Sequence, residues 1–181
     1  TDAQALRNSP VPVKVQLGAK GEGAGNIPEV AKKLAEESAA EVEALFDDNT
    51  RMAFITAGMG GGTGTGAAPV VARIAKEKGV LTVGIVTIPF LFEGEPKILQ
   101  AFAGVEEMRK HVDALLVINN ERLCKIYPDL SWTTAFAKAD DSLSNAARSI
   151  AELVSKDGKI NLDFADVRTT LKDGGAAVIS T

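Results

Sequence analysis

Apolar residues along this chain form short continuous runs, separated by stretches with a different period. Residues 52–57 and 114–118 are almost wholly apolar, and residues 80–87 form a third run interrupted by threonine and glycine. Such runs predict strands that are covered on both faces, as in a parallel sheet. Residues 13–17 instead alternate apolar and polar side chains, which predicts a half-buried strand. A last apolar run at residues 176–179 predicts another strand.

Between these runs, apolar positions recur at intervals of three or four residues, which predicts amphipathic helices. The expected helices cover residues 28–46, 67–78, 96–110, 121–126 and 132–156, and a shorter one runs through Val167 and Leu171. Asn26 is suited to cap the first helix, and Gly79 to end the second in the left-handed conformation. The helix over 132–156 would be roughly 35 Å long at 1.5 Å per residue, so its two ends must lie on opposite faces of the domain.

The alternation of strands and helices predicts an α/β fold, a Rossmann-like, doubly wound and mostly parallel sheet with a long central helix on its C-terminal side. In such folds, ligands bind at the carboxyl ends of the strands. A length of 181 residues suits one folding unit. Because the chain begins without Met and the run at 176–179 stops at its end, we expect a fragment of a longer protein.

Composition narrows the classes of partner. A net charge of −4 provides no basic surface for a polyanion, which argues against nucleic acid as a partner. Cys124 is the single cysteine, so an internal disulfide framework is excluded, and with no cationic-then-apolar leader we expect a cytoplasmic protein. No apolar run approaches the roughly 20 residues of a membrane-spanning helix, which argues against direct membrane insertion.

The densest glycine cluster lies at residues 58–66, between a predicted strand and a predicted helix. It reads Gly-Met-Gly-Gly-Gly-Thr-Gly-Thr-Gly, with six glycines in nine residues. Without Cβ atoms, backbone N–H groups can converge on an anion, and the helix N-terminus adds the positive end of its dipole. The cluster therefore predicts a phosphate-binding loop. A flexible glycine turn without a ligand is the alternative interpretation.

Two common phosphate-binding motifs do not fit this spacing. A Walker A loop needs a lysine after its second glycine, but Ala67 and Ala68 follow Gly66. A dinucleotide fingerprint needs glycines at relative positions one, three and six, and no register of the cluster supplies all three. The loop therefore belongs to a different class of nucleotide-binding protein.

Residues 61–66, Gly-Gly-Thr-Gly-Thr-Gly, are identical to the signature of the tubulin/FtsZ GTPase superfamily. The flanking residues 56–59 and 67–69 resemble its bacterial branch rather than eukaryotic tubulin, and residues 161–167 resemble its synergy loop. The similarity runs through the whole chain. It implies a GTP-binding domain, truncated at its N-terminus, over residues 1–156. Residues 157–181 would hold the synergy loop, the next helix and the first strand of an activation domain.

The resemblance assigns each part of GTP or GDP to a set of residues. For the phosphates these are Gly58, Gly60, Gly61, Gly62, Thr63, Gly64 and Thr65, with Ala24 and Gly25 in a loop that senses the γ-phosphate. For the ribose side they are Pro89, Glu93 and Lys97, and for the guanine base Asn120, Phe136 and Asp140. Phe136 also fits the apolar stripe of the long helix, so a purely structural role stays open. Mg²⁺ would be bound mainly through the phosphates, with no metal site made by the protein alone.

The resemblance also assigns Asn161, Asp163 and Asp166 to catalysis, although Asp163 could instead cap a helix. These residues follow the long helix, whose other end faces the nucleotide, so they cannot reach their own GTP. The implied protein hydrolyses GTP to GDP and phosphate at active sites shared between subunits of a head-to-tail homopolymer. Its expected place is the cytoplasm at the bacterial division septum, and its expected other partners are division proteins bound through parts outside this chain.

Several features bear on that expectation. The family's first phosphate loop would lie before Thr1 and the activation domain after Thr181, so we expect this chain alone to bind GTP poorly and not to turn it over. Residues 18–22 are a residue or two shorter than is usual in the family, and Lys97 stands where many relatives carry Arg. Two rival functions remain, a non-hydrolysing filament or scaffold module and a nicotinamide-dependent oxidoreductase on a Rossmann sheet.

Overall fold

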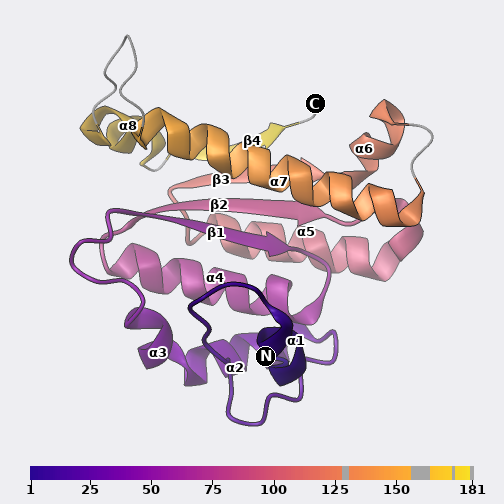
Figure 1. Ribbon diagram of the computed structural model, residues 1–181, viewed down its shortest axis with the longest axis horizontal. Helices are drawn as coiled ribbons and strands as arrows, with labels where there is room; N and C mark the ends of the chain where they lie inside the picture. The colour runs from indigo at the N-terminus through magenta and orange to yellow at the C-terminus, as the bar shows by residue number, and fades with distance from the viewer. Residues whose placement is uncertain (128–130, 156–163, 173, 180–181) are drawn as a thin grey trace.

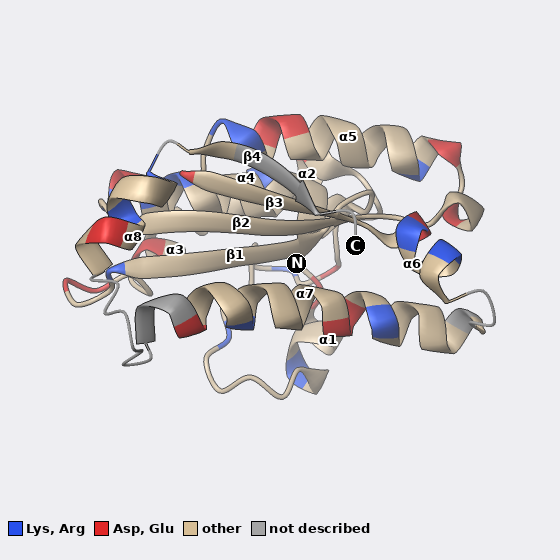
Figure 2. Ribbon diagram, turned by 90° about the horizontal axis from the view of Figure 1, so that it is seen from above, with Lys and Arg blue, Asp and Glu red and all other residues tan. Residues whose placement is uncertain are grey.

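The computed structural model describes residues 1–127, 131–155, 164–172 and 174–179. Its centre is a parallel sheet with the strand order β1-β2-β3-β4. The strands are β1 (Met52–Gly58), β2 (Leu81–Ile88), β3 (Ala114–Asn119) and β4 (Gly175–Ile179). None of them contains a charged residue, and Figure 2 shows the charges gathered on the helices and connecting segments. The predicted α/β sheet is therefore confirmed.

Helices cover both faces of the sheet (Figure 1). On one face lie α4 (Gly62–Glu77) and α5 (Glu95–Arg109), with α2 (Pro28–Glu37) and α3 (Ala39–Glu43) packed outside α4. The other face is covered by α7 (Trp132–Ser155). The remaining helices are α1 (Ala3–Asn8), α6 (Asn120–Ile126) and α8 (Phe164–Leu171), and Leu91–Glu93 form one 3-10 turn.

Strand β2 supplies the centre of the core because it is covered on both faces. Val86 packs with Met108 of α5 on one face, whereas Val83 and Ile85 pack with Leu143 and other apolar residues of α7 on the opposite face. All of these β2 side chains are at most 1% exposed. Burying such side chains contributes about 1.5–3 kcal/mol each, which fixes the register of the strand. The continuous apolar run in the sequence thus indicated β2 correctly.

The strand predicted over residues 13–17 is wrong. This segment is a loop, and Val13 is 65% exposed. Val15 and Leu17 do pack against the cluster between α2 and α4, so the alternation marked two of its three apolar side chains correctly as inward-facing and Val13 wrongly. A strand also needs a neighbour for its backbone hydrogen bonds, and in the described part of the chain nothing pairs with this segment as a ladder.

The helix predicted over residues 28–46 is divided into α2 and α3 at Ser38. Ser38 is 6% exposed, and its hydroxyl accepts a 2.9 Å hydrogen bond from the N–H of Gly18. The predicted cap is also wrong, since Ile27 occupies the N-cap position while Asn26 lies in the left-handed region with φ 62°. Strand β1 is half-buried rather than covered on both faces, because it lies at the edge of the described sheet.

The long helix is confirmed. It runs from the end of the sheet where the strands finish, called the carboxyl edge here, to the end where they begin, called the amino edge. Helix α6 follows β3 directly, so the start of α7 lies near the carboxyl edge, whereas α8 precedes β4 and lies at the amino edge (Figure 1). The contacts of α8 agree with this position. The guanidinium of Arg51, just before β1, lies 3.9 Å from the ring centre of Phe164, and Arg168 donates a hydrogen bond to the carbonyl of Gly79, just before β2.

Candidate functional site

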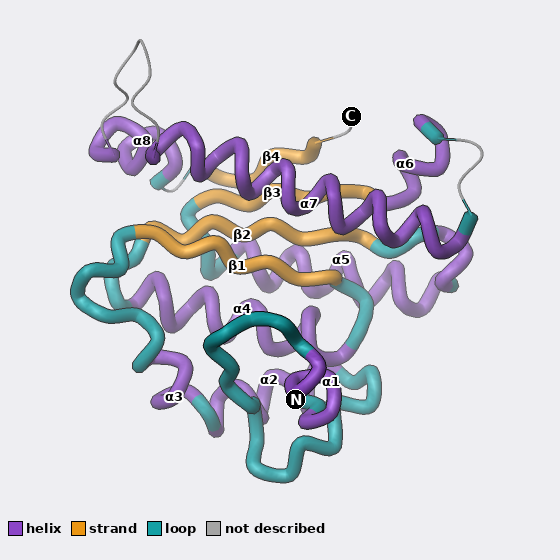
Figure 3. Tube along the Cα trace, viewed as in Figure 1, coloured by secondary structure: helices purple, strands orange, loops and turns teal. Residues whose placement is uncertain are grey.

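The loops that leave the carboxyl ends of the strands converge with a loop from the N-terminal region (Figure 3). Strand β1 ends at Gly58 and α4 begins at Gly62, so only three residues separate them. The helix predicted from residue 67 therefore begins five residues earlier, and the second half of the glycine cluster forms its first turn. At the other end of α4, Gly79 follows the C-cap residue Lys78 and has the predicted left-handed conformation, with φ 77°.

The N-terminus of α4 has no side-chain cap. Its N-cap residue, Gly61, provides no side-chain hydrogen bond, and the first turn contains no acidic residue. The first four N–H groups of a helix have no partner within the helix, and the helix dipole makes this end positive. Amides 61–64 therefore form a site with the chemistry that an anion requires.

Most glycines of the cluster are required by close packing of the backbone. A Cβ on Gly64 would lie closer than 3.0 Å to the carbonyl of Gly58, and one on Gly66 equally close to the carbonyl of Pro28. A Cβ on Gly62 would approach the N–H of Ile27 to 2.9 Å. Gly60, with φ 101°, faces the carbonyl of Lys97. These glycines allow α4 to lie directly against neighbouring backbone, while Gly58 and Gly61 have ordinary space for a Cβ.

The loop assigned to the γ-phosphate lies beside the glycine cluster. Ala24 is buried, and its Cβ is one of the atoms that a side chain on Gly62 would meet. Gly25 has φ 55° and open space around it. The hydroxyl oxygens of Thr1 and Thr63 are 2.6 Å apart, and the carbonyl of Thr1 accepts a hydrogen bond from Gly23. The structure thus brings together the phosphate-side residues that the sequence predicted.

On the ribose side, Glu93 is held by its own turn. Its Oε1 accepts a 3.0 Å hydrogen bond from the N–H of Phe90, and its Oε2 lies 3.4 Å from Nζ of Lys97. Its side chain is 18% exposed. The turn begins at Pro89, whose ring is near the space that a Cβ on Gly60 would fill. Pro89, Glu93 and Lys97 therefore lie on one connected segment beside the glycine cluster.

The predicted base residues lie where β3 ends and α7 begins. Asn120 is 5% exposed, and its Oδ1 is a buried acceptor with no hydrogen-bond partner in the described part of the chain. Phe136 is 43% exposed, and its ring packs edge-on against Phe90 at 5.3 Å between ring centres. Asp140 is exposed four residues further along α7, on the same side of the helix as Phe136. A buried acceptor and an exposed ring are chemically suited to a flat base.

Of the predicted catalytic residues, the structure describes Asp166 alone, and it is not at this edge. Asp166 is exposed in the first turn of α8, at the amino edge of the sheet, whereas Asn161 and Asp163 lie outside the described residues. Among the described residues, no group of three or more His, Cys, Asp or Glu side chains could hold a metal ion. No described helix combines the length and apolar character needed to cross a membrane.

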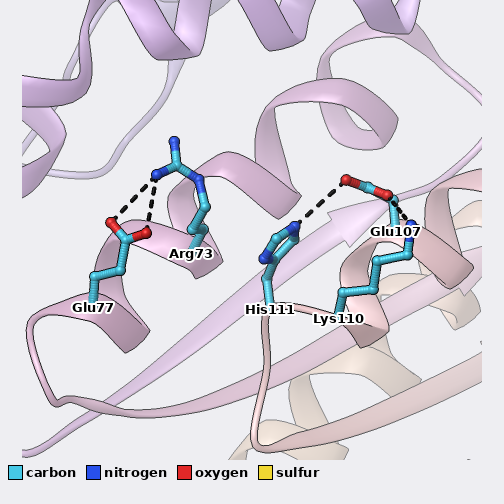
Figure 4. Close-up of polar contacts among 5 residues, drawn as sticks. All are labelled: Arg73, Glu77, Glu107, Lys110 and His111. Atoms are coloured by element: carbon cyan, nitrogen blue, oxygen red, sulfur yellow. Dashed lines mark hydrogen bonds and ion pairs between the residues drawn. The ribbon is translucent and has the colours of Figure 1, made fainter.

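A separate groove of about 690 Å³ lies between α2, α4 and α5. Thr65 and Gly66 form part of its wall, so it lies behind the glycine cluster. Five ionisable side chains in or beside it make contacts with one another (Figure 4): Arg73 with Glu77 at 3.1 Å, and Glu107 with Lys110 at 2.6 Å and with His111 at 3.4 Å. The hydrogen bond from Lys110 lowers the pKa of Glu107. No sequence motif predicted this groove.

The fold and the carboxyl edge define an α/β domain with a glycine-rich junction between its first described strand and the following helix. A family model places it more closely: the chain belongs to the Tubulin/FtsZ family, GTPase domain, whose model matches residues 1–128.

Known relatives agree with this assignment. The chain is 65% identical over 185 residues to "Cell division protein FtsZ" of Porphyromonas gingivalis, covering 100% of this chain and 40% of the relative. It is 47% identical over 182 residues to "Cell division protein FtsZ 1" of Methanocaldococcus jannaschii, covering 99% of this chain and 50% of that protein. The chain thus spans half the length, or less, of these relatives.

Solved structures resemble the fold closely. The structure titled "FtsZ dimer, empty (M. jannaschii)" matches with a TM-score of 0.92 at 46% identity, covering 97% of this chain and 52% of that one. The structure "CetZ2 from Haloferax volcanii - GTPgS bound protofilament" matches with a TM-score of 0.76 at 24% identity, covering 98% and 53%. The latter identity supports similarity of fold alone.

Proposed function

We propose that this chain is the guanine-nucleotide-binding part of a GTPase that assembles head to tail into filaments during cell division. The observation that carries the proposal is the uncapped N-terminus of α4, where amides 61–64 have neither a side-chain cap nor an acidic neighbour. In the proposed complex these amides, with Gly58, Gly60 and the loop at Ala24 and Gly25, surround the phosphates. Mg²⁺ binds mainly to the phosphate oxygens.

Selection of guanine rests on three side chains. The carboxylate of Asp140 accepts hydrogen bonds from N1 and N2 of guanine, whereas adenine presents an acceptor at that edge. Asn120, buried at the end of β3, borders the base without contacting it through its enclosed Oδ1. The exposed ring of Phe136 stacks on the purine. Glu93 accepts a ribose hydroxyl at the other side of the site.

Hydrolysis requires a second subunit because Asp166 and the glycine cluster lie at opposite edges of the sheet (Figure 1). In the proposed filament, Asn161, Asp163 and Asp166 of one subunit complete the phosphate site of the next. The acids orient a water whose oxygen bonds to the γ-phosphorus while the bond from that phosphorus to the β–γ bridging oxygen breaks, which yields GDP and phosphate. Such a head-to-tail contact leaves both filament ends open.

The proposal extends to the whole protein. Residues 1–156 are taken as the nucleotide-binding part and 157–181 as the start of a second domain. The protein works in the cytoplasm at the division septum and binds other division proteins through segments outside this chain. Membership of the Tubulin/FtsZ family argues against the oxidoreductase alternative. A filament module that binds GTP without hydrolysing it remains the second candidate.

The test is GTP hydrolysis by the full-length protein over a range of concentrations. A shared active site predicts that phosphate release per molecule is near zero at low concentration and rises above a threshold as subunits assemble. A rate per molecule that is independent of concentration would refute the shared site. Tight GTP binding with filaments but no phosphate release would instead favour the second candidate.

A further inference from the structure

The side-chain amide of Gln100 joins the two loops assigned to the phosphates. Its Nε2 donates a 3.0 Å hydrogen bond to the carbonyl of Gly60 and a 3.3 Å hydrogen bond to the carbonyl of Asn26. These acceptors are 40 and 74 residues away from Gln100 along the chain. Of the two ends of the Gln100 amide, the NH₂ group is the donor and the oxygen can only accept. The two carbonyl acceptors therefore fix which end of the amide faces them.

Both bonded residues have unusual backbone conformations. Asn26 lies in the left-handed region with φ 62°, and Gly60 has φ 101°. Asn is among the few non-glycine residues that adopt the left-handed region readily, and the hydrogen bond from Gln100 adds a contact that maintains it there. Gln100 therefore contacts the two loops at the points where their backbones turn most sharply.

The position of Gln100 is itself fixed by packing. The next residue of α5, Ala101, is fully buried, and Gly104 lies so close to Thr65 of α4 that a Cβ there would approach Thr65 Cγ2 to 2.6 Å. The α5 backbone is thus held against the first turn of α4. A side chain that starts from this backbone can hold the loops at a defined distance.

The hydrogen bond to Gly60 also sets the direction of an amide in the phosphate site. In a trans peptide the C=O and N–H groups point in opposite directions. Because the carbonyl of Gly60 is turned toward Gln100 on α5, the N–H of Gly61 points to the opposite side of the loop. Gly61 is the N-cap residue of α4, so this N–H belongs to the proposed anion site.

We propose that Gln100 is a positioning residue for the nucleotide site: it links the loop assigned to the γ-phosphate to the glycine cluster and orients the Gly61 amide. This inference rests on the proposed GTP binding. It assigns Gln100 no contact with the nucleotide. Because one amide bonds both loops, displacement of either loop is transmitted to the other, and GTP should depend on the link more than GDP does.

The test compares Gln100→Met and Gln100→Glu in the full-length protein. Methionine keeps the length and helix propensity of glutamine but has no donor, and glutamate places a negative charge opposite two carbonyl oxygens. Glu106→Met, an exposed position on the same helix, is the control. Loss of one or two hydrogen bonds predicts about tenfold weaker GTP binding in Gln100→Met, with a smaller loss for GDP, and wild-type values for Glu106→Met.

Hydrogen exchange without nucleotide separates this inference from the proposed function. Faster amide exchange at residues 24–27 and 58–62 in Gln100→Met, with unchanged exchange in β2, would support the link even if the wild-type protein failed to bind GTP. Failure of the wild type to bind GTP would refute the proposed function alone. Unchanged exchange in both loops, or equal losses of GTP and GDP affinity, would overturn the positioning role.

Discussion

The hydroxyl oxygen of Thr65 accepts a 2.9 Å hydrogen bond from the backbone N–H of Gly60. Thr65 is in the first turn of α4 and is only 6% exposed, so this bond closes the loop between β1 and α4 on itself. Family resemblance assigns Thr65 to the phosphates. In the structure the Thr65 hydroxyl stabilises the loop that would bind the phosphates.

Replacing Thr65 by Val should therefore destabilise the domain. Valine has nearly the same shape but leaves the N–H of Gly60 buried without an acceptor, which costs about 1–3 kcal/mol. Thr65→Ser keeps the acceptor and is the matched control. Urea unfolding measures both variants. A free energy of unfolding for Thr65→Val equal to that of the wild type would show that the hydrogen bond contributes nothing.

Alanine should be tolerated at Gly58 but should destabilise the protein at Gly64. Gly64→Ala forces the carbonyl of Gly58 and α4 apart, so we expect a loss of about 1–3 kcal/mol or more in stability together with weaker GTP binding. Gly58→Ala is the control for stability alone, because the nearest atom to its Cβ would be Thr87 Oγ1 at an ordinary 3.6 Å, whereas Gly58 is itself assigned to the phosphates. Thermal unfolding and nucleotide titration of the full-length variants decide the matter. Equal tolerance at both positions would contradict the packing argument.

A shared active site predicts rescue between two inactive variants. Asp166→Ala should keep GTP binding but lose turnover, whereas Asp140→Ala should lose GTP binding while keeping the catalytic acids. In an equimolar mixture, random assembly pairs an intact nucleotide site with an intact acid at about a quarter of the contacts. Phosphate release should therefore return to about that fraction of the wild-type rate. A mixture as inactive as its components, under conditions where filaments form, would count against sharing.

The pairing of Glu107 predicts a change of stability in acid. The hydrogen bond from Lys110 lowers the pKa of Glu107 in the folded protein below its ordinary value of 4.5. The pair therefore contributes stability that is present above pH 4.5 and is lost as the pH falls through the lower, folded-state pKa. Because Glu107 is 35% exposed, we expect only a few tenths of a kcal/mol.

Glu107→Gln tests this expectation, with Glu106→Gln as the control at an exposed neighbouring position. Urea unfolding at several pH values between 3 and 7 should give a difference between wild type and Glu107→Gln that shrinks in acid. A difference that is constant with pH, or equal to that of Glu106→Gln, would exclude the pairing as its cause.

Prediction from the sequence succeeded where burial alone determines the structure. Strands β2 and β3 are covered on both faces, so their apolar runs identified them. The length of α7 placed Asp166 at the opposite edge from the glycine cluster, because helix rise per residue is constant. Prediction from the sequence failed where the local structure depends on a residue that is distant along the chain. The break at Ser38 depends on Gly18, and the loop at residues 13–17 on the absence of a pairing strand in the described sheet.

In the candidate site, too, the sequence indicated the features that depend on local composition and missed those that depend on distant contacts. The glycine cluster could be located because its composition is unusual, but most of its glycines are needed for contact with the backbone of Ile27, Pro28, Gly58 and Lys97, which only the folded chain reveals. Gln100 carried no sequence signal, since one glutamine on an amphipathic helix has no distinguishing pattern. Helix α1 was also missed, because none of its six residues is buried and no apolar period marks it.

The most direct measurement of the central claim is a crystal structure of the full-length protein with a non-hydrolysable GTP analogue and Mg²⁺. The account predicts phosphate oxygens within hydrogen-bond distance of the amides at residues 61–64, with the guanine edge at Asp140 and Asp166 of a neighbouring subunit approaching the γ-phosphate. Phosphates bound elsewhere, such as in the groove between α2, α4 and α5, or Asp166 beside the nucleotide of its own subunit, would contradict it.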